Sequence, residues 1–128
     1  MLWILPLALM AQSTTDGNSD PWFPFGKSAT FVAYINPSTT RVQADGSRAI
    51  WLQYVLNKPR KDGTIRMLIR TEFNCQNETS STLALTWYDA IGNVTYQHTV
   101  TPYERTVQAI TPESILNSAL DLVCKKAT

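Results

Sequence analysis

The stretch TIRMLIRTEFNC, residues 64–75, alternates apolar and polar side chains over most of its length. One parity begins at Ile65 and ends at Cys75, whereas Arg66 and Arg70 lie on the other. A period of two is typical of a β-strand with one covered and one mostly wet face. The stretch is therefore predicted to be a strand of a half-buried sheet, with Cys75 on the covered face.

The only other cysteine, Cys124, lies in a segment with a different period. Apolar residues recur there at helical spacing and form one stripe: Ile115, Leu116, Ala119, Leu120 and Val123. Thr111 is a good N-cap and Pro112 suits the first turn. We therefore expect a helix that begins at Pro112 and buries its stripe on the covered face of the sheet.

The first residues have the pattern of an export signal. An apolar run from Leu2 to Met10 precedes Ala11-Gln12-Ser13, the small-x-small pattern that signal peptidase requires. We expect residues 1–13 to be a signal peptide, residues 14–26 a linker and residues 27–128 a single domain; a buried first strand or helix is the alternative for the apolar run. No cysteine follows the run, so no lipid anchor is expected.

Export would place the two cysteines in an oxidising compartment, where they can form a disulfide with each other. Paired cysteines are usual in oxidising compartments, and the alternatives, a reactive thiol or a metal site, need a base or more ligands. The chain contains one histidine. We therefore expect a Cys75–Cys124 disulfide that clamps the helix to the sheet.

The remaining apolar segments predict further strands. Residues 82–88 and 94–100 alternate around Gly92-Asn93, as in a hairpin. Residues 49–56 are apolar on both parities, as expected for a central strand.

Two shorter segments precede that central strand. Asp45-Gly46 provides a turn from it back to TTRVQA, residues 39–44, and FVAYI, residues 31–35, is expected to be a short strand that stops at Asn36-Pro37. The predicted fold is α+β and mainly β: an antiparallel twisted sheet of about five or six strands, with a C-terminal α-helix packed on one face and clamped by a disulfide.

Composition and residue types argue against several function classes. Charged residues make up 16% of the chain and the formal net charge is +1, which does not fit a nucleic-acid-binding surface. His98 shares the parity of apolar neighbours, so it is interpreted as a half-buried strand residue rather than a base. The sequence has no Gly-rich phosphate loop and no zinc-site spacing. We expect no catalytic residue, no metal, no cofactor and no nucleic-acid partner.

The order of these features resembles the surface-adhesin protein E family of Gram-negative bacteria. The resemblance covers about residues 22–126 and rests on short motifs: Trp22, FVAYINPSTTRV, AIWLQYV with Trp51, EFNC with Cys75, and a terminal helix ending in LVC with Cys124. It implies a small exported domain with an antiparallel sheet, a C-terminal helix and a cysteine pair. Its best-known members resemble dimeric, lipid-anchored surface proteins that attach to host matrix and serum proteins, with a role in haem uptake suggested.

This resemblance favours a non-enzymatic exported binding module, adhesin-like, that binds host or extracellular proteins. The alternative is a periplasmic structural, accessory or inhibitor/immunity-type protein, which the absent lipid-anchoring cysteine favours. Both place the protein outside the cytoplasm, in the periplasm or at the cell surface. Residues 31–35 and 39–44 are expected near a sheet edge, where an unpaired strand favours a homodimer.

A basic loop is the candidate recognition site. The loop NKPRKDG, residues 57–63, contains the densest group of cations in the chain, and the wetter parity of the next strand would extend it. The candidate ligand-binding residues are Lys58, Arg60, Lys61, Arg66 and Arg70. The alternative is a solvated hairpin tip that keeps the sheet soluble.

Overall fold

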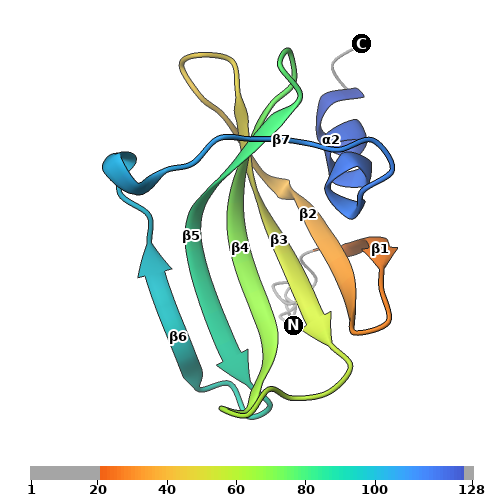
Figure 1. Cartoon of the computed structure of the whole chain (residues 1–128), viewed down its shortest axis with the longest axis vertical. Helices are drawn as coiled ribbons and strands as arrows, with labels where there is room; N and C mark the ends of the chain where they lie inside the picture. The colour runs from red at the N-terminus through yellow and green to blue at the C-terminus, as the bar shows by residue number, and fades with distance from the viewer. Residues whose placement is uncertain (1–20, 126–128) are drawn as a thin grey trace, which may run out of the picture.

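Six strands run antiparallel in chain order across one sheet, and one helix packs on it (Figure 1). The computed structural model describes residues 21–125. The strands are β1 (Phe23–Lys27), β2 (Phe31–Val42), β3 (Arg48–Leu56), β4 (Thr64–Asn74), β5 (Thr79–Asp89) and β6 (Val94–Thr99). The 3₁₀ turn η2 (Pro102–Glu104), the short strand β7 (Gln108–Ala109), which pairs with β5, and the helix α2 (Ile115–Lys125) follow. The predicted fold class is confirmed, while the expected signal peptide lies outside the described residues.

Strand β4 confirms the period that predicted it. Phe73 is fully buried and Thr71 is 4% exposed, whereas Arg66 and Arg70 lie on the opposite parity. Cys75 follows the last strand residue directly. We call the face that carries Phe73 the inner face and the opposite one the outer face.

Strand β2 is longer than the sequence predicts. The expected stop at Asn36-Pro37 is wrong, because the strand continues to Val42 with an irregular register between Asn36 and Arg41. The buried Asn36 holds this bulge: its Oδ1 accepts hydrogen bonds from the backbone N–H and the hydroxyl of Ser38. A bulge lets a strand pass a proline, which has no N–H to donate to the ladder.

The expected edge of the sheet is wrong for residues 31–35 and correct for the far end of β2. Residues 31–35 pair on one side with β3 and on the other with β1, which includes residues 23–26 of the expected linker. Arg41 and Val42 pair with β3 alone, so they continue the edge that β1 begins, and β6 forms the opposite edge. Strand β1 has five residues interrupted by a register shift, so it has little period to detect.

Helix α2 begins at Ile115, three residues later than predicted from Pro112. Glu113 has a φ of 71°, a left-handed conformation that cannot continue a helix. The hydroxyl of Ser114, not that of Thr111, accepts the hydrogen bond from the first turn, at 3.1 Å from the backbone nitrogen of Asn117.

The core lies between α2 and the inner face, as predicted. Ala119, Leu120 and Val123 of the helix pack with buried sheet residues and with Ile110: Ile35, Ile50, Leu52 and Phe73.

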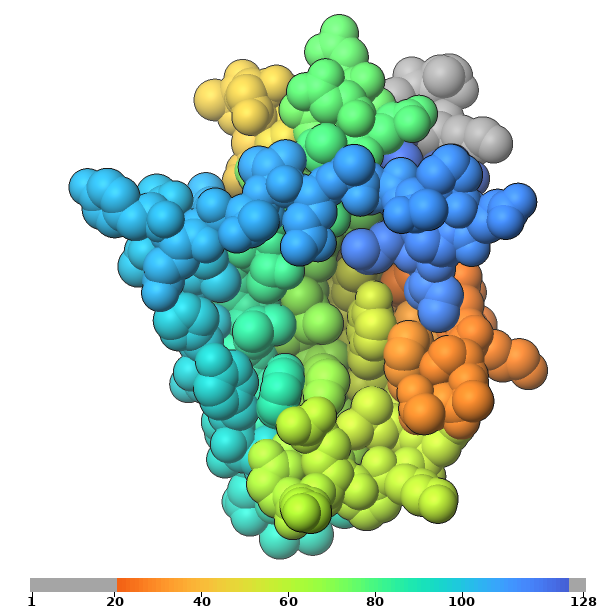
Figure 2. All heavy atoms as spheres, in the orientation of Figure 1, coloured from red at the N-terminus to blue at the C-terminus, as the bar shows by residue number. Residues whose placement is uncertain are grey.

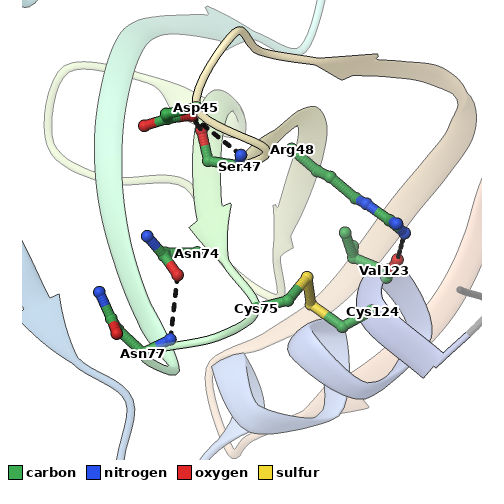
Figure 3. The surroundings of a disulfide bond; sticks show 8 residues. All are labelled: Asp45, Ser47, Arg48, Asn74, Cys75, Asn77, Val123 and Cys124. Carbon is green, nitrogen blue, oxygen red and sulfur yellow. Dashed lines mark hydrogen bonds between the residues drawn. A yellow bond between two sulfur atoms is a disulfide. The ribbon is translucent and has the colours of Figure 1, made fainter.

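The end of the helix is attached to the sheet twice (Figure 3). A Cys75–Cys124 disulfide, with the two Cα atoms 5.6 Å apart, joins the end of β4 to α2. Beside it, Arg48 Nη1 donates a hydrogen bond to the carbonyl of Val123 at 2.7 Å. The positive charge of Arg48 also interacts favourably with the negative, C-terminal end of the helix dipole.

Removing the disulfide should destabilise the domain strongly. The two cysteines are 49 positions apart, and the loop-entropy model gives about 4 kcal/mol for such a loop. We expect Cys75→Ser/Cys124→Ser to lower the free energy of unfolding in urea by about 2–4 kcal/mol. Alkylation of the native, unreduced chain should find no free thiol, and labelling of both cysteines would contradict the pairing.

Gly26 should resist substitution for a steric reason. A Cβ placed on it would lie 2.9 Å from Cγ2 of Ile115, so β1 approaches the first turn of α2 as closely as a glycine permits. Gly26→Ala is expected to cost about 1–3 kcal/mol of folding free energy, measured by urea unfolding. The same change in an Ile115→Ala background should cost clearly less, because the clashing atoms are gone; equal costs would show that the contact is not responsible.

Candidate functional site

The outer face brings arginines and aromatic rings together. Arg70 pairs across the strands with Trp51, and Arg66 pairs with Tyr88. The Cζ atom of Arg66 lies 4.5 Å from the centre of the Tyr88 ring, and that of Arg70 lies 5.7 Å from the Trp51 ring. These distances are typical of cation–π contacts. We call these four residues the arginine–aromatic face.

Hydrogen bonds hold both guanidinium groups in place. Nη1 of Arg66 donates to Oε1 of Gln53 at 3.1 Å, and Nη1 of Arg70 donates to the carbonyl of Thr39 at 3.0 Å. Thr39 belongs to the bulge of β2, where its own hydroxyl donates to the carbonyl of Asn36. The bulge therefore positions one of the two arginines.

The positive charge of this face is not neutralised within the described part of the chain. Between residues 21 and 125, the one ion pair is His98–Glu104, so no carboxylate lies within 4 Å of the guanidinium nitrogens of Arg66 or Arg70. Partial burial, and then the charge of nearby Arg41, lower the pKa of Arg70. An anion bound beside Arg70 would offset its repulsion by Arg41.

The basic loop is separate from this face. Lys58, Arg60 and Lys61 are all exposed in the turn between β3 and β4. Arg60, however, lies 5.0 Å over the ring of Trp87, and Trp87 pairs with Met67 on the inner-face parity. The candidate residues therefore divide into a loop group, one member of which turns toward the inner face, and the pair Arg66 and Arg70 on the outer face.

The inner face is hollowed beside the helix (Figure 2). A cavity of about 330 Å³ lies between the sheet, α2 and the segment that leads from β6 to β7. Leu52, Ile69 and Leu85 form part of its apolar lining, while Glu104 and Gln108 contribute polar groups. This cavity is a second concave feature, distinct from the arginine–aromatic face.

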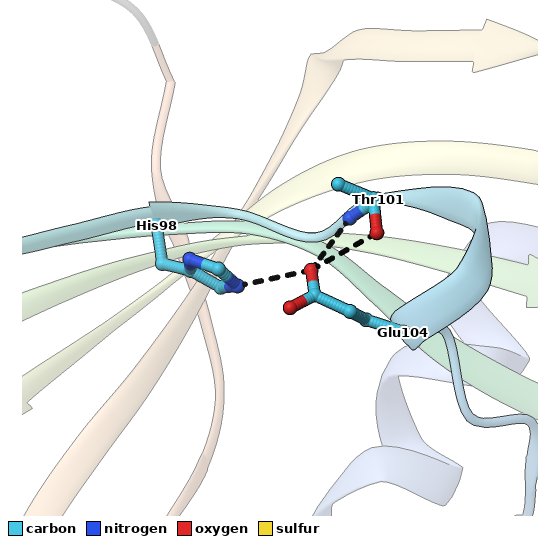
Figure 4. Close-up of polar contacts among 3 residues, drawn as sticks. All are labelled: His98, Thr101 and Glu104. Carbon is cyan, nitrogen blue, oxygen red and sulfur yellow. Dashed lines mark hydrogen bonds and ion pairs between the residues drawn. The ribbon is translucent and has the colours of Figure 1, made fainter.

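Glu104 organises the turn beside this cavity (Figure 4). Its Oε1 accepts hydrogen bonds from the backbone N–H and the hydroxyl of Thr101, at 2.9 and 3.1 Å, and lies 3.3 Å from Nε2 of His98. The hydrogen bonds from Thr101, followed by the charge and hydrogen bond of His98, lower the pKa of Glu104. His98 is thus engaged with a capping carboxylate rather than with a nucleophile.

Sequence reasoning missed Trp87, Tyr88 and Gln53 as site residues. Each becomes relevant only through its neighbour on the next strand, and the β4–β5 register shifts twice, at the start of β4 and between Arg70 and Thr71. Between residues 21 and 125 there is no group of three or more His, Cys, Asp or Glu side chains placed to hold a metal ion. No helix in the same range is long and apolar enough to cross a membrane.

Comparison with known families gives a match to the model of surface-adhesin protein E over residues 22–125. The chain belongs to this family. The match covers the whole sheet, the disulfide and α2, so the resemblance inferred from short motifs is confirmed. A search of curated protein sequences gives no match.

Solved structures of Haemophilus influenzae protein E have the same fold. One covers 81% of this chain and 90% of its own chain, with 14% identity and a TM-score of 0.58. Crystal form II covers 80% and 93% at 14% identity, with a TM-score of 0.57. At identities this low, the likeness establishes a shared architecture.

Acid should release the turn at Glu104. A carboxylate with a lowered pKa stabilises the folded turn fully above its ordinary pKa of about 4.5, and this stabilisation is lost as pH falls through the lower folded value. We expect the backbone amide of Thr101 to shift in NMR spectra and to exchange faster with solvent on acidification. In Glu104→Gln this titration should disappear; its persistence would assign it to another group.

Proposed function

We propose that this chain is a non-enzymatic, exported binding module that attaches to host or extracellular proteins through its arginine–aromatic face. Membership of the adhesin family supports the general role. The observation that carries the choice of surface is the placement of two guanidinium groups over aromatic rings without a carboxylate partner among residues 21–125.

The chemistry of this face suits an acidic protein segment. Arginine can bind a carboxylate through two parallel hydrogen bonds, which lysine cannot do. Tryptophan, tyrosine and arginine are also the residue types that contribute most to binding at protein interfaces. Because hydrogen bonds already hold both guanidinium groups, the two arginines lose little further freedom when a ligand binds.

The proposal also includes export of the chain and its location in the cell. Residues 1–13 would direct the chain out of the cytoplasm, and the mature protein would act at the cell surface. The periplasmic alternative, an accessory or inhibitor-type partner, would place the same face against a bacterial protein. A homodimer would use an edge strand; β6 is the candidate, because its Val94 and Tyr96 are 52% and 44% exposed.

Removing the two outer-face arginines should abolish most protein binding. We expect Arg66→Gln/Arg70→Gln to weaken capture of the chain on surfaces coated with matrix or serum proteins by about 2 kcal/mol or more, the size typical of interface hot spots. Surface plasmon resonance at low and high salt would measure it, with urea unfolding to show that both chains are folded.

The matched control removes the same charge from the loop. Lys58→Gln/Lys61→Gln should leave affinity nearly unchanged and reduce mainly the association rate at low salt, because exposed cations act over about a Debye length. If the loop variant loses binding as fully as the arginine variant, the binding surface is the loop. If neither variant changes capture, the arginine–aromatic face is not the binding surface.

A further inference from the structure

A second cavity lies on the inner-face side of the sheet, at the end of the helix. It has a volume of about 390 Å³ and is bounded by β1, the bulge of β2, the start of β3 and the last turns of α2. Its lining is mostly apolar: Phe23, Ile35, Pro37, Ile50 and Leu122, with Thr40, Val123 and Arg48. Phe23 and Leu122 remain 52% and 48% exposed, so apolar side chains also border its opening.

The cationic group of this cavity is incompletely partnered. Arg48 pairs across the strands with Phe73, which places it on the inner face beside the helix end (Figure 3). It has five N–H donors; Nη1 donates to the carbonyl of Val123, and Nε is buried without a hydrogen-bond partner. Within the described residues no carboxylate lies within 4 Å of its guanidinium nitrogens. A partly buried cation with free donors is costly unless an anion meets it.

We propose that this cavity binds a single-chain amphiphile with an anionic head, a fatty acid. Its carboxylate would meet the guanidinium group of Arg48, and its acyl chain would lie along Phe23, Ile35 and Ile50. The volume is near the lower end of the range of about 300–1,000 Å³ for small-molecule sites, which suits one acyl chain rather than two. The site is independent of the arginine–aromatic face, since it lies on the other side of the sheet.

The test uses the exported chain with decanoate, below its critical micelle concentration, and its uncharged analogue decanol, below its solubility in water. Calorimetry should show decanoate binding more tightly than decanol by about ten- to hundred-fold, the range expected for hydrogen bonds to a charged group. The ¹⁵N-edited NMR signal of the Arg48 Nε–H, assigned by its absence in Arg48→Lys, should shift with decanoate. Equal affinity for the two probes, or no binding of either, would overturn the proposal.

Arg48 also donates a hydrogen bond to the helix, so changing it could alter folding as well as binding. The decisive variant therefore changes a different residue of the cavity. Leu122→Glu places a negative charge at the opening of the cavity, and Leu122→Gln is its neutral control of nearly the same shape. We expect the Glu variant to weaken decanoate binding by about ten-fold more than the Gln variant while both unfold at similar urea concentrations. Indistinguishable affinities in the two variants would exclude Arg48 as the carboxylate partner.

A membrane lipid could supply the same anionic head and acyl chain. Sedimentation with phosphatidylglycerol vesicles separates the two sources: a chain that binds free decanoate and stays in the supernatant supports the free fatty acid. Sedimentation that Leu122→Glu abolishes, without binding of free decanoate, would overturn the fatty-acid assignment in favour of a bilayer lipid.

Discussion

The attachment of α2 to the inner face of the sheet is the contact on which the rest of the fold depends. A meander of six strands has two faces, and without a second layer both would meet water. The stripe of Ala119, Leu120 and Val123 covers one of them. The disulfide and the bond from Arg48 to the Val123 carbonyl hold the last turn of the helix where that stripe meets the sheet.

Covering one face makes the other available for recognition. The pleat of β4 sends Phe73 into the core and Arg70 to the outer face, so one strand serves both the core and the candidate binding surface. The bulge of β2 connects the two roles further. The buried side chain of Asn36 holds the bulge in place. Within the bulge, the carbonyl of Thr39 accepts a hydrogen bond from Arg70.

Sequence patterns were sufficient where the physical signal is local. The alternation of β4, the helical stripe and the cysteine pair were predictable because each depends on spacing along the chain. The bulge at Asn36, the left-handed Glu113 and the five-residue strand β1 were not, because none of them leaves a periodic apolar pattern in the sequence. Arg60 and Arg66 contact different rings, Trp87 and Tyr88, on opposite faces of the sheet. These contacts depend on the register between strands and on the turn after β3, which no single segment of the sequence encodes.

The meander order has a consequence for how the protein is made. Every strand from β1 to β6 pairs with its neighbour in sequence, so each strand can pair as soon as the next one has emerged. Cys75 is then in place before Cys124 has left the translocation channel, 49 residues later. Because Cys124 follows every strand in the chain, this disulfide can form only after all six strands of the meander are available. A chain that ends before α2 keeps Cys75 unpaired, and a free thiol in an oxidising compartment is open to thiol–disulfide exchange.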